Sequence, residues 1–133
     1  MIYETQEQLN EALTLWQERL QLRDWTIRAT LVSPRELEDA DGDIHVHIPL
    51  KAAFIRICTE QHDKAKLITE MDQERALVHE LIHIHMEPLW PEDAATDSLE
   101  WRMAEQATQA LTLSVIAAWH QDLAAGRKVI QGA

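Results

Sequence analysis

The chain has 133 residues and a formal net charge of −11, with 46% hydrophobic and 26% charged residues. This length fits one domain with a buried core, and the composition is typical of a globular protein rather than a disordered one. The acidic balance argues against nucleic acid as a partner, because binding a phosphate backbone needs a basic surface. We expect a single domain over residues 1–133, with a frayed tail at about 127–133.

The number of cysteines and the first residues of the chain indicate the cellular compartment that we expect. Cys58 is the only cysteine, so no intramolecular disulfide and no zinc site built from several cysteines can form. A reducing, cytoplasmic setting is the simplest fit. Residues 1–5 lack the basic and apolar regions of a signal peptide, and no apolar run approaches membrane-spanning length. We therefore expect a soluble cytoplasmic protein that does not bind membranes.

The first predicted element is a helix that begins after Thr5 and ends near Leu22. Thr5 and Gln8 have the spacing of a capping box. The apolar residues that follow recur at helical spacing and form one stripe, which is far more typical of a core than of a binding surface. These residues are Leu9, Ala12, Leu13, Trp16 and Leu20.

Three strands are predicted next, at residues 25–32, 44–48 and 52–58, because these segments are β-branched or alternate in polarity. Asp41-Gly42 is a turn signal before the second strand. The links between the strands are short, which favours a small sheet that is mostly antiparallel or mixed.

The second strand places two histidines on one face. Ile44, Val46 and Ile48 are expected to face the core, with His45 and His47 on the opposite side. Two histidines at this spacing can bind a metal, but no carboxylate or cysteine accompanies them. A solvated strand face is therefore the simpler interpretation.

The second predicted helix begins near Asp72, ends before Pro88 and contains His79-Glu80-Leu81-Ile82-His83. Four-residue spacing places both imidazoles on one helical face, where two nitrogens can reach one Zn²⁺ at about 2.0–2.1 Å. Glu80 lies close enough to meet a metal-bound water without being a ligand. The composition predicts on the order of 0.04 chance matches to this motif. We expect one zinc ion here; ordinary hydrogen bonds within a core are the alternative.

The third predicted helix has Asp97 or Ser98 as its N-cap and continues to about residue 124, with Gly126 as its C-terminal signal. The segment from Thr59 to Thr69 is expected to be a loop. Glu100 stands three residues after Asp97, which makes it a capping-box partner.

A catalytic zinc site needs a third protein ligand and an open position for water. His85 points about 200° around the helix from His83, which disfavours it. Glu105 is our choice, because a carboxylate among apolar neighbours inside a helix needs a partner; solvent exposure is the alternative. Glu100 is second because of its capping role. The other candidates are less well placed: Glu87, Asp93, Asp97 and His120.

The zinc helix followed about twenty residues later by a helical glutamate resembles the gluzincin branch of zinc metallopeptidases. The order of elements is similar, over most of the chain, to the small zincin-like metallopeptidases of phages and prophages, sometimes called minigluzincins. Only the zinc helix is a specific motif; the remainder rests on Trp16, Trp25, the strand Ala53–Ile57 and Glu105-Gln106-Ala107.

The resemblance implies an α+β, zincin-like domain: an N-terminal helix, a three-stranded sheet, the HExxH helix and a long C-terminal helix. It makes His79, His83 and Glu105 the zinc ligands and Glu80 the general base. It also implies a cytoplasmic protein of a bacterium carrying such a phage or prophage.

The resemblance also predicts where substrate binds. It makes the strand at Ala53–Cys58 the sheet edge beside the cleft, where an extended peptide adds by β-augmentation and contacts Phe54, Ile55 and Arg56.

The chain departs from the larger gluzincins in one respect. Those enzymes add a Tyr or His that stabilises the oxyanion, and Tyr3 is the only tyrosine of this chain. The sequence does not choose among the possible substitutes, which are His85, His47 and Arg102.

We expect a zinc metallopeptidase that hydrolyses peptide or protein substrates through a zinc-activated water, with Glu80 accepting its proton. One alternative is a zinc-containing regulatory or protein-binding module whose activity is weak or lost. Another is a metal-dependent hydrolase that acts on a bond other than a peptide bond.

Overall fold

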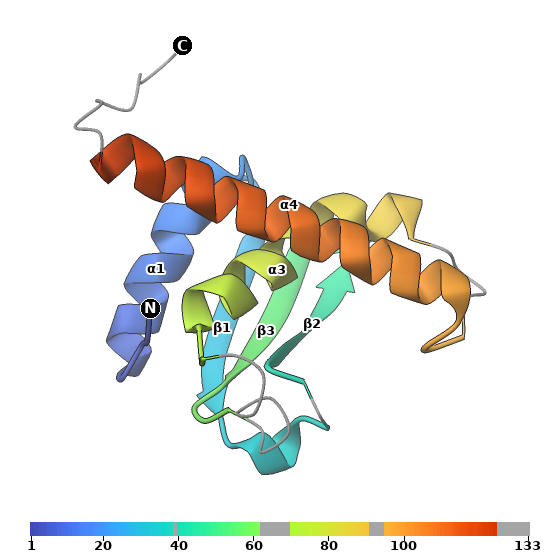
Figure 1. The fold of residues 1–133 in the computed structure, drawn as a ribbon, viewed down its shortest axis with the longest axis horizontal. Coiled ribbons are helices and arrows are strands. Elements are labelled where there is room, and N and C mark those ends of the chain that lie inside the picture. The colour runs from blue at the N-terminus through green and yellow to red at the C-terminus, as the bar shows by residue number, and fades with distance from the viewer. Residues whose placement is uncertain (39, 62–69, 91–94, 125–133) are drawn as a thin grey trace. The chain divides into compact units, whose positions relative to one another are not determined.

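The computed structural model describes residues 1–38, 40–61, 70–90 and 95–124. It has an α+β fold with three long helices and a three-stranded sheet (Figure 1). Residue contacts divide the chain into two compact units, Met1–Trp90 and Pro91–Ala133. The first unit holds the sheet and two helices, and the second holds one helix. None of the helices in the described ranges is long and apolar enough to cross a membrane.

Helix α1, Gln6–Arg19, begins as its sequence predicts. The Thr5 side chain accepts a hydrogen bond from the Gln8 backbone, and the Gln8 side chain accepts one from Thr5 in return. The helix ends three residues before the predicted Leu22, because the chain turns at Gln21, whose φ is 61°. Leu22 is still buried and belongs to the core.

The sheet is mixed, with the strand order β1-β3-β2. Strand β1, Thr26–Val32, runs parallel to β3, Ala52–Cys58, and β2, Gly42–His47, runs antiparallel to β3. The expectation of a mostly antiparallel sheet is therefore met by one of the two strand pairs. The tight connection from β2 to β3 turns at Lys51, whose φ is 47°.

The expected edge position of Ala53–Cys58 is wrong. This strand is β3, which pairs with β1 on one side and with β2 on the other. Its backbone groups are engaged on both sides, so no further strand can add to it. The edges of the sheet are β1 and β2.

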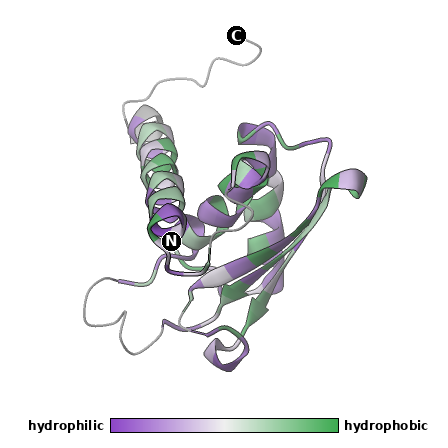
Figure 2. Cartoon of the chain, turned by 90° about the vertical axis from the view of Figure 1, so that its right-hand side faces the viewer, coloured by the Kyte–Doolittle hydropathy of each residue, from purple (hydrophilic) through white to green (hydrophobic). Residues whose placement is uncertain are grey.

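Side chains alternate between the two faces of the sheet, as the strand pattern predicts. Ala53, Ile55 and Ile57 of β3 are buried on the face that α1 and α3 cover. In Figure 2, which colours the chain by hydropathy, the strands are seen nearly edge-on beside these helices. His45 and His47 are exposed on the other face, while Ile44 and Val46 of the same strand are partly buried. The predicted core position of Ile48 is wrong, because β2 ends at His47 and the Ile48 side chain in the following turn is exposed.

Helix α3, Gln73–Met86, carries the motif and matches the predicted bounds. The Asp72 side chain caps it by accepting a hydrogen bond from the Arg75 backbone at 3.0 Å. Its buried apolar residues pack against the sheet and α1. They are Leu77, Val78, Leu81, Ile82 and Ile84.

Helix α4, Leu99–Ala124, forms the described part of the second unit. The hydroxyl of Ser98 accepts a hydrogen bond from the Trp101 backbone at 3.2 Å, which makes Ser98 the cap. Asp97 has a φ of 67°, a conformation outside the extended region of an N-cap. The predicted capping box between Asp97 and Glu100 is therefore wrong. Predictions at residues 62–69, at Asp93, at Gly126 and in the 127–133 tail lie outside the described residues.

Candidate metal centre

The first turn of α3 is held by the N-terminal segment and β3. The Gln73 backbone donates to the Met1 carbonyl at 3.0 Å, and its side chain accepts from the Tyr3 backbone and donates to the Cys58 carbonyl at 2.8 Å. The Trp16 indole donates to the Glu74 carboxylate at 3.3 Å. Gln73 and Glu74 are both buried, so these bonds satisfy polar groups inside the core and fix the helix at that end.

Two turns further along α3, the structure brings His79, Glu80 and His83 together. Their possible ligand atoms all lie within 4.8 Å of one another. The Nε2 atoms of the two histidines are 3.2 Å apart. The Glu80 side chain is only 6% exposed, while both imidazoles are partly buried.

The separation of the two imidazole nitrogens fits a shared metal ion. Two nitrogens bound to one tetrahedral zinc at about 2.0–2.1 Å are separated by about 3.3 Å. The distance between His79 and His83 is 3.2 Å, so both could bind zinc without moving apart. A hydrogen bond from one imidazole to the other has the same separation. Imidazole nitrogens are suitable ligands for zinc, and the Glu80 carboxylate lies beside them.

Two neighbours of the motif were not predicted as part of the site. The ring of Trp90 lies 4.7 Å from that of His83, tilted by 48°, and so covers one side of this imidazole. A Cβ added at Gly42 of β2 would lie 3.6 Å from the Glu80 Cγ. The sequence indicated a turn at Gly42, and Trp90 follows the predicted end of the helix before Pro88. Helical spacing from His83 therefore does not reach Trp90, and no local signal placed it beside the motif.

The edge strand β2 therefore runs beside the motif. The Cys58 backbone donates a hydrogen bond to the Asp41 carbonyl at 2.9 Å. In an antiparallel pair, this bond determines which residues of β2 direct their backbone groups toward β3 and which direct them away. By this alternation the N–H and C=O groups of Gly42, Ile44 and Val46 point away from β3. No strand in the described part of the chain pairs with them.

The structure argues against several residues of the first unit that were candidates for zinc binding or for stabilising the oxyanion. His85 donates from Nε2 to the Leu20 carbonyl at 2.7 Å and so points toward the end of α1, as its angular position predicted. Tyr3 is buried against the first turn of α3; its burial, with Glu74 nearby, raises the pKa of its phenol well above the ordinary value. A neutral buried phenol at that end of the helix cannot serve as the oxyanion donor. His47 lies on the outer face of the sheet, and Glu87 lies beyond the end of α3.

The remaining candidates belong to the second unit, where Glu100, Arg102, Glu105 and His120 lie on α4 and Asp97 precedes it. Glu105 is partly buried and Glu100 is exposed. The Nε atom of Arg102 lies 4.0 Å from the Oδ1 atom of Asp97. Because Ser98 caps the helix, the capping role that placed Glu100 second no longer applies. The assignment of Glu105 as the third ligand remains a prediction.

Comparison of the chain with protein-family models, with curated proteins and with solved structures found no match.

Proposed function

We propose that the chain is a zinc-dependent peptidase of the gluzincin type, similar to the small zincin-like peptidases of phages. The observation that carries the proposal is the geometry on α3: two imidazole nitrogens 3.2 Å apart, with the Glu80 carboxylate beside them. Two partly buried histidines and a buried glutamate are costly to place together unless they share a function or a partner.

In this proposal His79 and His83 hold the zinc ion, with Glu105 as third ligand. A bound zinc ion lowers the pKa of its water to about 7 and polarises the scissile carbonyl. Glu80 accepts the proton of the attacking water and passes it to the leaving amine. Glu80 is buried, and β2 runs beside it, so little space is left around its side chain.

The substrate is an extended peptide that pairs with β2. The free backbone groups of Gly42, Ile44 and Val46 offer the hydrogen bonds of one additional strand. This edge replaces β3, whose residues Phe54, Ile55 and Arg56 lie in the centre of the sheet. Trp90 would form an apolar wall beside His83.

The test compares the wild type with Glu80→Gln on a diverse peptide library, with zinc content measured in both. We expect cleavage by the wild type and a loss of at least about 100-fold in Glu80→Gln, because general base catalysis contributes about that much or more. The zinc content should be equal, since Glu80 is not a ligand. Equal cleavage by both proteins, or cleavage by neither, would count against the proposal.

A second candidate is a zinc-containing regulatory or protein-binding module with weak or lost activity. It is favoured by the position of Tyr3, the only tyrosine, which is buried away from the motif. Zinc binding by both proteins with cleavage by neither would select this candidate.

A further inference from the structure

The face of the sheet opposite α1 and α3 carries a row of three side chains that differ in chemistry: a cation, an aromatic ring and an imidazole. The pairing of the strands places Arg28 of β1 beside Phe54 of β3 and Phe54 beside His45 of β2. Paired residues point to the same side of a sheet, so the three side chains form one row. All three are exposed, and Phe54 retains 40% of its accessible surface. We call this surface the outer face.

A small residue leaves a depression next to this row. The neighbouring row is Thr26, Ala52 and His47, in which Ala52 is flanked by larger side chains. A shallow pocket of about 300 Å³ lies over Ala52, between Phe54, Arg28 and the two histidines. Its lining surface is mostly apolar, so it suits an apolar side chain.

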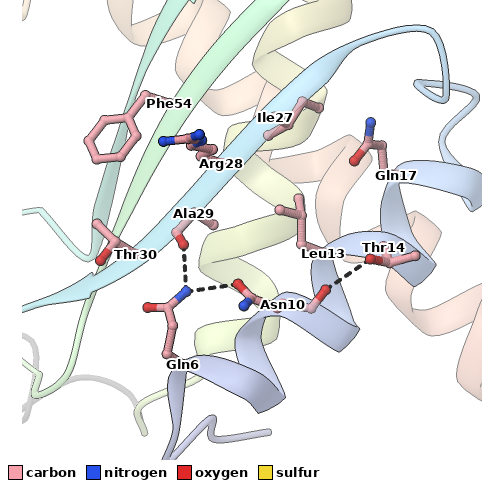
Figure 3. Close-up of a pocket in the computed structure, with 10 residues that line it drawn as sticks. All are labelled: Gln6, Asn10, Leu13, Thr14, Gln17, Ile27, Arg28, Ala29, Thr30 and Phe54. Atoms are coloured by element: carbon pink, nitrogen blue, oxygen red, sulfur yellow. Dashed lines mark hydrogen bonds between the residues drawn. The ribbon is translucent and has the colours of Figure 1, made fainter.

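A second pocket, of about 450 Å³, meets the first at Arg28 and Phe54. It follows the free edge of β1 beside α1, and Figure 3 shows the Arg28 and Phe54 side chains together on one side of β1. The Gln6 side chain crosses this edge: it donates to the Ala29 carbonyl at 2.7 Å and accepts from the Leu31 backbone at 3.4 Å. The two pockets together form a continuous surface across the sheet.

The charge of this surface is opposite to that of the whole chain. No residue that lines either pocket is acidic, although the chain contains 23 Asp and Glu residues. Neighbouring cations are neutralised: Arg56 pairs with Asp43, and Lys51 pairs with Asp24 at 2.7 Å. Among the described residues Arg28 has no such carboxylate partner. The surface therefore presents a cation and two imidazoles around an apolar floor.

We propose that the outer face binds an acidic peptide segment of a protein partner, in which a large apolar residue is flanked by carboxylates. The apolar residue occupies the depression over Ala52 and contacts Phe54. One carboxylate accepts hydrogen bonds from the Arg28 guanidinium, and the other lies near His45. Adjacent strands are about 4.8 Å apart, so Arg28 and His45 stand about 10 Å apart on either side of Phe54. An exposed ion pair alone adds little affinity, which is why the apolar contact is needed.

This site is separate from the metal centre, because His79, Glu80 and His83 lie on the helix that covers the other face. The inference does not depend on the proposed peptidase activity.

The test selects random displayed peptides on the full chain carrying Glu80→Gln, so that no peptide is cleaved. A selected peptide is then synthesised with a fluorescent label, and its affinity is measured by anisotropy. We expect enrichment of peptides with an apolar residue between Asp or Glu residues. The dissociation constant should rise at least about tenfold in Arg28→Glu and in Phe54→Ala, since few contacts dominate such an interface.

Arg23→Glu is the matched control, because Arg23 is an exposed arginine that lines neither pocket. It should leave the affinity unchanged. Arg28→Glu should regain affinity for a peptide in which one acidic residue is replaced by Lys, which a merely misfolded variant would not do. Enrichment of neutral or basic peptides, no enrichment at all, or binding that survives Arg28→Glu would overturn the inference.

Discussion

Glu80 and Gly42 illustrate how single residues define the candidate centre. Glu80 is buried, and a Cβ added at Gly42 of the adjacent strand would lie 3.6 Å from the Glu80 Cγ, which is an ordinary contact distance. A Cβ at position 42 would lie 2.9 Å from the Arg56 carbonyl oxygen and 3.2 Å from the Ile57 Cδ1. The first separation is shorter than real Cβ contacts allow, and it involves backbone that cannot move without disturbing the strand pair.

Gly42→Ala should therefore destabilise the chain by about 1–3 kcal/mol, the usual cost of overpacking. The measurement is urea unfolding followed by circular dichroism. Asp41→Ala is the control, because the neighbouring Asp41 side chain is exposed and its removal should change stability by less than about 0.5 kcal/mol. Equal stability of Gly42→Ala and the wild type would show that β2 leaves room for a Cβ beside the Arg56 carbonyl.

Cys58 gives a prediction about pH. Its thiol is buried and donates to the Ala40 carbonyl at 3.3 Å; burial, with Asp41 and Asp43 nearby, raises its pKa to about 11. In the unfolded chain the thiol releases its proton near its ordinary pKa of about 8.5. Between these values the unfolded state binds fewer protons than the folded state, so stability falls as pH rises.

The free energy of unfolding should therefore decrease from about pH 9 to about pH 11, by as much as about 1.4 kcal/mol per pH unit from this thiol. Urea titrations at several pH values measure this slope. Cys58→Ala should be less stable at neutral pH but should show a flatter decline. The same slope in both proteins would mean that the thiol does not contribute.

For the secondary-structure elements, the helix starts could be predicted from local sequence, whereas the pairing of the strands could not. The cap at Thr5 and the start of α3 near Asp72 were identified because the signals for a helix start lie within a few residues of one another. The HExxH residues were identified for the same reason, since helical periodicity alone places them together.

The central position of β3 depends instead on contacts between distant segments. Strand β1 pairs with β3 rather than with the next strand in the chain, and no local pattern specifies that choice. The partners of Trp90 and Gly42 were missed for a related reason, because turn signals say where a chain bends and not what it then contacts. At the start of α4, the sequence allowed either Asp97 or Ser98 as the N-cap. The backbone conformation of Asp97 excludes it, and Ser98 caps the helix.

Helix α4 carries Glu105 and Glu100, our first and second choices for the third ligand, which allows a direct comparison. Glu105→Ala should weaken zinc binding by at least about 100-fold, since even partners outside the ligand set commonly contribute 10–100-fold. Glu100→Ala is the matched control and should bind zinc as the wild type does. Competition with a chromophoric chelator measures both affinities. A larger effect of Glu100→Ala, or no effect of either change, would contradict the assignment.

In the whole molecule, the two proposed sites lie in different parts of the first unit from the residues that support α3. The covered face of the sheet supports α3 and its buried polar anchors, Gln73 and Glu74. The edge of β2 adjoins the candidate metal centre. The outer face carries Arg28 and Phe54 and is available for a different partner. A chain with a net charge of −11 would repel acidic partners generally, so the location of this basic surface determines where one can bind.

The central claim is that His79 and His83 bind one zinc ion, and elemental analysis of the purified full chain tests it most directly. We predict one zinc per chain in the wild type and in Glu80→Gln, and no bound zinc in His79→Ala/His83→Ala. Zinc added to the metal-free wild type should also raise its melting temperature, because binding to the folded state alone stabilises it. A wild-type protein that purifies without metal and gains no stability from added zinc would contradict the claim.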